Sequence, residues 1–320
     1  MPGLEGARRH RDHARGGAGL NTVLIAGASG TIGTALAPAL EERGVAVRRL
    51  VRRPARSAEE VAWDPAAHRL DPAALEGVDA IVNLSGASVG RIPWTRAYKR
   101  TLVDSRLDAT STLTRAMEAV AEAGGTPPRV LLSASAIGFY GDRPGESLDE
   151  DSPAGEGFFP KLVAAWEAEA RTAPAGTRVV LARNGVVFAP SGGALAPIRL
   201  VTKLGLGSRL GSGRQRWSWI ALDDEVRALV HLLLESELDG PVNLAAPNSN
   251  SSVEITRAAA RVLHRPHLFW LPEWVIRLLM GEAGQRLLLD DLDVHPTRLQ
   301  ADGFAWTKAD LEGALAAALR

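Results

Sequence analysis

The sequence contains no cysteine, which removes several kinds of chemistry at once. Disulfide bonds, thiolate metal ligands and cysteine nucleophiles are all excluded. The formal net charge is zero, so nothing in the charge balance indicates a nucleic-acid partner or an anionic membrane surface. The nearest approach to a membrane span, Leu268 to Met280, is interrupted by a proline and two charged residues. We therefore expect a cytoplasmic protein with no nucleic-acid and no membrane partner.

The composition is otherwise that of an ordinary globular chain, with 320 residues, 46% hydrophobic and 23% charged. Residues 1–20 are basic and rich in glycine, and they lack the apolar centre of a secretory signal, so we predict a disordered tail. We expect a dinucleotide-binding domain over residues 21–190 and a smaller, mostly helical region on the substrate side over residues 191–320. Association into a homodimer stays open.

The alternation of apolar and helical segments indicates an α/β fold with a Rossmann-type, doubly wound parallel sheet. Thr22 to Ala26 is continuously apolar after its first residue, as is typical of a strand covered on both faces. A glycine turn, a helix from about Ile32 to Arg43 and a second strand from Val45 to Val51 follow. Further strands are predicted at 80–84, 130–132 and 178–182.

Beyond Val187 the pattern changes to helices with readable ends. We predict a helix over 223–235 that opens on two aspartates with a structural role at the helix N-terminus. Ser251 and Glu254 have the spacing of a capping box, and Thr307 with Asp310 predicts a similar cap before a final helix at 311–319.

The segment between the first strand and the first helix has the spacing GxxGxxG. Glycines here allow a tight turn and a close backbone approach to a pyrophosphate, which the positive helix N-terminus attracts. A plain βα turn is the alternative, but the strand before it and the helix after it favour dinucleotide binding. The predicted contacts are Gly27, Ser29, Gly30, Thr31, Ile32 and Gly33.

The end of the second strand predicts which dinucleotide binds. NAD sites usually carry an acidic residue there, but no Asp or Glu occurs from Gly44 to Ser57. The strand end carries four arginines instead, and a guanidinium matches a 2′-phosphate in charge and geometry. These side chains could also be solvated surface arginines, but we favour NADP(H). The four are Arg48, Arg49, Arg52 and Arg53.

Several motifs together resemble an extended short-chain dehydrogenase/reductase. They include GASGTIG, the Asn83–Ala87 segment, LLSASAIGFYGD (131–142), LARNGVVFAPSGGAL (181–195) and the tail LPEWVIRLLMGEAGQRLLLDDLDVHPTRLQADGFAW (271–306). More narrowly, the chain is similar to an atypical, epimerase-like branch that carries its own C-terminal helical extension and is sometimes labelled cell-division inhibitor. The resemblance covers about residues 22 to 319, and the tail is its specific part.

The resemblance implies an NADP-dependent oxidoreductase or epimerase-like protein whose substrate is not settled. It places Val51 and Arg52 at the adenosine 2′-phosphate and Asp64 at the adenine edge. It also implies that four further residues line the cofactor, namely Leu84, Ser85, Thr101 and Arg106. Asp64 could instead cap a turn before Pro65, and Arg106 could be a surface helix residue.

The chain departs from the family at the catalytic pair. Short-chain dehydrogenases use YxxxK, in which the tyrosine exchanges a proton and the lysine lowers its pKa. Neither of the two tyrosines has a lysine four residues on, and the aligned positions hold Phe159 and Val163. Neither side chain can exchange a proton, so the usual acid–base pair is missing.

Two hydroxyls remain as catalytic candidates just after the strand predicted at 130–132. Ser135 could polarise a substrate carbonyl, or it could bond to its own loop. Tyr140 is the nearby aromatic hydroxyl, and without a basic neighbour we expect its pKa to stay near 10. The Gly211–Gln215 loop with Trp217 and Trp219 would suit a polar or phosphorylated ligand, although core packing explains at least one tryptophan more simply.

Two functions follow. The first is a reductase or epimerase-like enzyme that acts with NADP(H) on a small polar substrate through an unconventional proton donor. The second is a non-catalytic NADP(H)-binding redox sensor or regulator. A sugar-nucleotide epimerase is weakened because no base is evident for either face of the ring. The histidines show no metal-ligand spacing, so we assign no metal.

Overall fold

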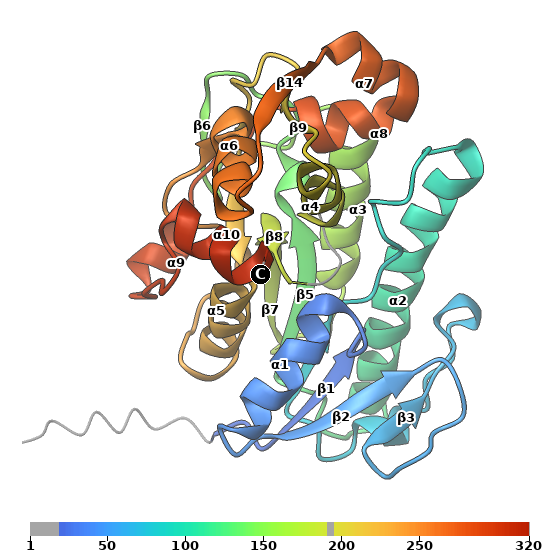
Figure 1. Ribbon diagram of the computed structural model, residues 1–320. Helices are drawn as coiled ribbons and strands as arrows, with labels where there is room; N and C mark the ends of the chain where they lie inside the picture. Colours follow the sequence, from blue (N-terminus) through green and yellow to red (C-terminus); the bar gives the residue numbers. More distant parts are fainter. Residues whose placement is uncertain (1–18, 191–194, 320) are drawn as a thin grey trace, which may run out of the picture.

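A parallel sheet of seven strands forms the centre of the structure, a computed structural model that describes residues 19–190 and 195–319 (Figure 1). The predicted tail therefore lies almost wholly outside the described residues. From one edge to the other the strands are β12 (Gly240–Leu244), β7 (Arg178–Asn184), β5 (Val130–Ala136), β4 (Ala80–Asn83), β1 (Thr22–Ala26), β2 (Ala46–Val51) and β3 (Glu60–Ala62). The strand order reverses at β1: β2 and β3 lie on one side of it, and the strands that follow along the chain lie on the other, as in a doubly wound sheet.

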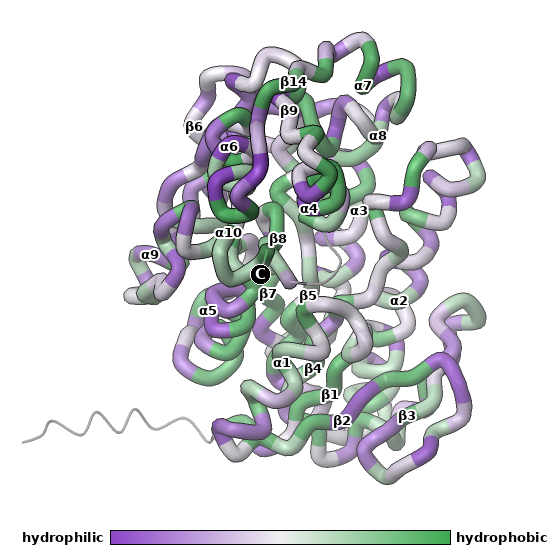
Figure 2. The backbone as a smooth tube through the Cα atoms, viewed as in Figure 1, coloured by the Kyte–Doolittle hydropathy of each residue, from purple (hydrophilic) through white to green (hydrophobic). Residues whose placement is uncertain are grey.

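Helices cover both faces of this sheet (Figure 1). Alternate residues of β1 face opposite ways: Val23 and Ile25 pack with α1 (Thr31–Glu41) and α5 (Leu222–Leu234). Leu24 and Ala26 pack on the other side, with α2 (Arg96–Glu122) and the end of α3 (Phe158–Ala170). In Figure 2 the central strands are accordingly hydrophobic along much of their length. The predicted Rossmann-type architecture is confirmed.

The chain leaves the sheet twice, and its two regions are interleaved. After β7 it forms β8 (Val186–Phe188), α4 (Leu195–Lys203), β9 (Gly207–Leu210), β10 (Arg216–Trp217) and β11 (Trp219–Ala221). It then returns as α5 and β12, so the sheet does not end at the expected boundary of residue 190. The rest is β13 (Asn250–Ser251), α6 (Ser252–Val262), β14 (His267–Leu271), α7 (Glu273–Met280), α8 (Glu282–Gly284), a π-helix (Gln285–Leu289), β15 (Asp293–Val294), α9 (Thr297–Ala301) and α10 (Leu311–Leu319).

Short elements complete the connections: 3-10 helices at Pro65–Ala67, Pro72–Leu75 and Ile137–Phe139, and β6 at Ser147–Leu148. Among the described residues, no helix is both long and apolar enough to cross a membrane.

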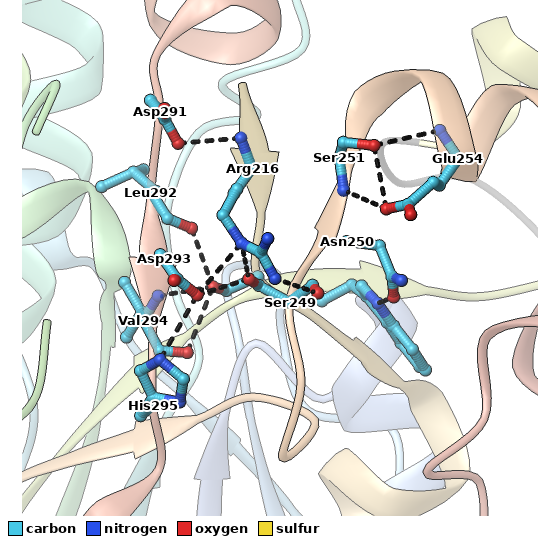
Figure 3. A network of polar contacts seen from close by, with 12 residues as sticks. Arg216, Ser249, Asn250, Ser251, Glu254, Asp291, Leu292, Asp293, Val294 and His295 are labelled. Carbon is cyan, nitrogen blue, oxygen red and sulfur yellow. Dashed lines mark hydrogen bonds and ion pairs between the residues drawn. The ribbon is translucent and has the colours of Figure 1, made fainter. Parts of the chain in front are cut away.

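Polar contacts fasten the C-terminal segment to the rest of the chain (Figure 3). The Arg216 guanidinium donates to the hydroxyl and carbonyl oxygens of Ser249, at 2.6 and 2.8 Å, and lies 3.3 Å from Asp293. Asp293 also accepts from Ser249 and pairs with His295. The serine hydroxyl thus bonds the carboxylate and not the imidazole, which makes this cluster an anchor and not a nucleophile–base pair.

Two kinds of contact hold the last helix and the segment before it: hydrogen bonds to a buried aspartate and helix capping. The Ser251–Glu254 capping box of α6 is present as predicted, and Asp310 caps α10 by accepting from the Gly313 N–H. The prediction for Thr307 was wrong, because its N–H and hydroxyl both donate to buried Asp224. Asp224 has the structural role expected of it, but it binds the C-terminal segment in addition to its own helix.

Candidate functional site

The glycine turn joins β1, at the centre of the sheet, to α1. Gly27 has φ +83°, and a Cβ placed on it would lie 2.8 Å from the carbonyl group of Leu84. A Cβ on Gly33 would lie 2.5 Å from the Gly27 oxygen, so helix and turn approach too closely for any side chain. Helix α1 begins after Gly30 without a side-chain cap and without an acidic residue in its first turn. Its first N–H groups are therefore available to an anion.

The segment after β4 lies directly against this turn. The Leu84 N–H donates to the Ala26 oxygen at 2.8 Å, and the Ser85 N–H donates to the Asn83 side chain at 3.1 Å. Leu84 and Ser85 are half-buried, while Ser29, Gly30 and Thr31 are exposed. The structure thus brings the predicted residues of both segments together at the carboxyl edge of the sheet, where ligands bind in such folds.

The four arginines near the end of β2 differ in their contacts. Arg53 forms two hydrogen bonds with Glu60 of β3, at 2.6 and 2.7 Å, and this pairing lowers the pKa of Glu60 to about 2. Arg48 donates to the Ala74 oxygen and Arg49 pairs with Glu41. Arg52 is exposed and makes no hydrogen bond or ion pair with the described residues. It follows half-buried Val51 and is the arginine of this group that can meet a ligand without breaking a contact.

Asp64 caps the 3-10 helix Pro65–Ala67 and pairs with Arg69 at 2.7 Å. The turn-capping alternative therefore describes its contacts in the free protein. Its side chain is nevertheless partly exposed, at 44%, which leaves it accessible beside the edge strands.

Arg106 is a buried cation on α2, which excludes the alternative of a surface helix residue. Its guanidinium donates to the Leu102 oxygen at 3.0 Å and lies over the Trp166 ring at 5.1 Å. A Cβ on Gly86 would come within 3.2 Å of the guanidinium carbon, which places the group directly behind the Asn83–Ala87 segment. No described carboxylate pairs with it, and burial lowers the pKa of Arg106 to about 10. Thr101 lies exposed nearer the start of α2, with its hydroxyl bonded to Ala97.

The end of β5 holds a different arrangement, a buried network around an ion pair. Glu167 of α3 and Arg183 of β7 form two hydrogen bonds, at 2.8 and 2.9 Å, with side chains only 6% and 3% exposed. The Ser135 hydroxyl donates to the same Glu167 carboxylate at 2.6 Å. Ser135 therefore does not bond to its own loop, and its proton is committed to a carboxylate.

Tyr140 extends this network. Its hydroxyl accepts from Arg183 at 2.9 Å and donates to the Asn243 side chain at 2.7 Å, while the Asn243 N–H donates to buried Glu150. The tyrosine is fully buried. Its pKa does not stay near 10: burial raises it to about 12, although the cationic Arg183 opposes the shift. The sequence did not reveal Arg183 as its neighbour.

The positions of the missing catalytic pair are filled by packing. Val163 is fully buried, and Phe159 lies against Gly138, where a Cβ would come within 2.2 Å of its ring. The Phe159 ring also packs with Trp94, at 5.7 Å between centroids. Beside them, Lys99 of α2 pairs with Glu282 of α8 and lies 4.7 Å over the Phe158 ring. This pair links the two regions of the chain.

The 211–215 loop contributes less than its composition suggested. The amide of buried Gln215 donates to the Leu210 and Leu288 oxygens and accepts from Ser212. Both tryptophans, Trp217 and Trp219, are buried, so packing explains the two of them. Ser212 and Arg214 are both exposed, and because the Ser212 hydroxyl is bonded to Gln215, Arg214 is the exposed charged group of this loop that remains for a ligand.

A buried carboxylate at the start of α5 was not anticipated. Glu225 is fully buried, with one oxygen bonded to the Asn184 amide at 3.1 Å and the other without a partner among the described residues. Burial raises its pKa to about 8. In the sequence it follows Asp223 and Asp224, of which Asp223 is exposed and Asp224 is buried, and only the helical period, which turns it toward the sheet, could have singled it out.

Comparison with known proteins identifies relatives along nearly the whole chain. The profile of the NAD dependent epimerase/dehydratase family matches residues 23–245, and that of a domain of unknown function, DUF1731, matches residues 271–318. Epimerase family protein Mb2239 of Mycobacterium bovis is 44% identical over 283 residues, which are 88% of this chain and 92% of the relative.

Human epimerase family protein SDR39U1 is 33% identical over 296 residues, 92% of this chain and 98% of the relative. The crystal structure of its isoform 2 with NADPH superposes with a TM-score of 0.84 at 32% identity and covers 93% of this chain and 99% of that one.

Proposed function

Because the chain belongs to the NAD dependent epimerase/dehydratase family, we propose that it binds NADP(H) at the turn between β1 and α1. The pyrophosphate would lie on Gly27, Ser29, Gly30, Thr31, Ile32 and Gly33. The turn fits this group because a Cβ on Gly27 or Gly33 would fill the space and because the start of α1 is uncapped. NADPH in the crystal structure of the human relative supports the same assignment.

The observation that carries the preference for NADP(H) is the free guanidinium of Arg52. Its three neighbouring arginines are engaged with the protein, whereas Arg52 is exposed beside Val51 at the strand end. A 2′-phosphate there would gain a charge-assisted contact, and the carboxylate of Glu60 on the neighbouring strand β3 is already paired with Arg53. Asp64 would lie at the adenine edge.

The remaining proposed contacts lie on β4 and α2. Leu84 and Ser85 would follow the cofactor, with Thr101 and Arg106 reaching it from the helix. Arg106 supports this assignment because a buried guanidinium without a carboxylate lacks a counter-charge, and a phosphate oxygen supplies one.

For the reaction we propose an oxidoreductase or epimerase-like step on a small polar substrate. When bound, the nicotinamide supplies or accepts a hydride. The chain's own residues contribute shape and exclusion of water: Phe159 and Val163 are apolar where the proton-exchanging pair would stand. Ser135 and Tyr140 contribute to the structure of this region and not to proton transfer, because each hydroxyl already donates within a closed network. The proton then comes from solvent, from the substrate or from another polar group.

A non-catalytic NADP(H) sensor is the second candidate, and one observation favours it specifically. The polar groups at the end of β5 satisfy one another, and apolar Phe159 and Val163 stand at the positions of the acid–base pair, so these side chains are committed to structure and not to proton exchange. A sensor would function through the binding and release of NADP(H), without turning over a substrate.

Calorimetry tests the cofactor proposal. We expect NADPH to bind more tightly than NADH and Arg52→Ala to remove about ten- to hundredfold of that preference, as for a lost charge-assisted hydrogen bond. Arg49→Ala is the matched control, because Arg49 is engaged with Glu41 and should leave the ratio unchanged. Equal affinities of the wild-type chain for the two cofactors would contradict the proposal.

Turnover assays separate the two candidates. NADPH oxidation is followed against a broad panel of carbonyl and enone compounds with the full chain. Turnover on a polar substrate supports the enzyme, whereas tight NADPH binding without turnover on any compound supports the sensor.

A further inference from the structure

The described residues leave an apolar surface on β14 and α7 uncovered, and we propose that it binds a second copy of this chain through antiparallel pairing of the two β14 strands. The surface consists of Leu268, Phe269, Trp270, Trp274, Leu278 and Leu279. Each of these side chains is more than half exposed, and Leu268 reaches 81%. Strand β14 and helix α7 lie together at one end of the molecule, away from the central sheet (Figure 1).

The first argument is the free edge of β14. The strand pairs with β9 along one side, and no strand of the described chain pairs with its other side. An edge of this kind presents unpaired N–H and C=O groups to any extended segment. Natural edge strands are usually protected by a lysine, a proline or an inward charge, but residues 267–271 read HLFWL and contain none of these.

The second argument is that the edge is compatible with itself. Antiparallel pairing about a two-fold axis at Phe269 sets Leu268 opposite Trp270 and His267 opposite Leu271, so no like charges meet. His267 stays neutral near pH 7, since burial lowers its pKa. Trp274, Leu278 and Leu279 follow directly on α7 and would extend the contact on either side of the paired strands.

The third argument is charge complementarity at the ends of the strand. Arg265 precedes β14 and forms no ion pair with the described residues. Glu273 follows it and is held only loosely by Arg277, at 3.5 Å. Counted from Phe269, the two lie at equal distances on opposite sides, so the two-fold axis brings Arg265 of one copy toward Glu273 of the other. An apolar centre with opposite charges at its rim is the pattern of a self-complementary interface.

Sedimentation equilibrium of the full chain tests the proposal. The wild-type chain should dimerise in the micromolar range, and Phe269→Lys should weaken the dimer at least about thirtyfold, because it places two like charges at the axis. Ile92→Lys is the matched control: Ile92 is an exposed apolar residue on another loop, at 42%, and should leave the dimer unchanged. Unchanged far-UV circular dichroism and NADPH affinity show that Phe269→Lys still folds.

Charge exchange identifies the partner as a second copy. Arg265→Glu and Glu273→Arg should each weaken the dimer about three- to tenfold, and the double variant should restore it. The proposal is overturned by a wild-type monomer throughout the micromolar range, or by a dimer that Phe269→Lys leaves intact. Binding of the monomer to phosphatidylglycerol vesicles through the same six residues would also overturn it, in favour of a lipid surface.

Discussion

Two groups of polar residues at the carboxyl edge of one sheet are built in opposite ways. Around the β1–α1 turn, the backbone N–H groups and the guanidiniums of Arg52 and Arg106 find no counter-charge among the residues that the structure describes. At the end of β5, Glu167, Arg183, Ser135 and Tyr140 satisfy one another in a closed network. Unmet polar groups indicate a ligand that completes the site, whereas a satisfied network indicates a structural role.

The largest expected effect is a loss of stability when the buried network at the end of β5 is broken. Arg183→Met leaves the buried Glu167 carboxylate without its partner, which should cost about 3–5 kcal/mol of unfolding free energy. Urea denaturation measures this loss, and Glu167→Leu added to it should recover most of the loss. Arg49→Met breaks the exposed pair with Glu41 and should cost less than about 1 kcal/mol. Similar losses from the two substitutions would mean that the network is not buried as described.

The next prediction tests the site with unmet polar groups, the turn between β1 and α1. Gly27→Ala puts a Cβ 2.8 Å from the Leu84 backbone and should weaken NADPH binding about thirtyfold, from an overpacking cost of about 2 kcal/mol. Gly44→Ala is the control, because Gly44 has φ +77° with open space around its Cβ position. Both variants carry the left-handed strain, so calorimetry separates strain from close approach. Equal binding by the two would leave the glycines with a turn role only.

A third prediction concerns the pH dependence of stability and Glu225, which belongs neither to the glycine turn nor to the network at the end of β5. The folded pKa of Glu225, about 8, lies above its ordinary value of 4.5, so the folded state holds the proton more tightly. Its contribution to stability is complete below about pH 4.5 and is lost as the pH rises through 8. Glu225→Gln should remove about 3–4 kcal/mol of the fall in unfolding free energy between pH 5 and pH 8, because over this range the unfolded state has lost a proton that the folded state keeps.

Asp223→Asn is the matched control for Glu225→Gln, because Asp223 is exposed on the same turn of α5. Denaturation of both variants across the pH range provides the comparison. A wild-type pH profile retained by Glu225→Gln would assign the titration to another group.

The smallest effects test whether the satisfied network is catalytic after all. Ser135→Ala and Tyr140→Phe each remove one buried hydroxyl and should cost about 1 kcal/mol of stability while NADPH affinity stays within about twofold. On any substrate that is turned over, the rate should persist. A loss of about a hundredfold in rate with unchanged stability would make the affected hydroxyl a proton donor.

The sequence predicted the architecture because its signals are local. The apolar strand from Thr22 to Ala26, the glycine turn and the capping box at Ser251 depend on neighbours within a few residues, and each is present in the structure. Short edge strands gave no such signal: β3 has three residues, and β12 comes only after the first departure of the chain from the sheet, which follows β7.

Of the candidate site, the sequence predicted the glycine turn, where the backbone itself forms the binding surface, but not the side-chain network at the end of β5. The network at the end of β5 joins residues from four separate parts of the chain, with 103 positions between Tyr140 and Asn243. A charged residue at the end of an apolar strand, Arg183, was the visible trace of it. Burial is the main cause of the raised pKa of Tyr140 and of the lowered pKa of Arg106, and a single sequence does not report the burial of individual polar residues.

The interleaving of the two regions also sets an order of events during synthesis. The sheet lacks its edge strand β12 and the covering helix α5 until residue 244 has left the ribosome. Until then β7 is itself an open edge, and the apolar face that α5 covers is in contact with water. We therefore expect a nascent chain of 190 residues to be open to chaperones and proteases and not yet to act as an independent binding domain, although it contains the whole glycine turn and both arginines of the cofactor side.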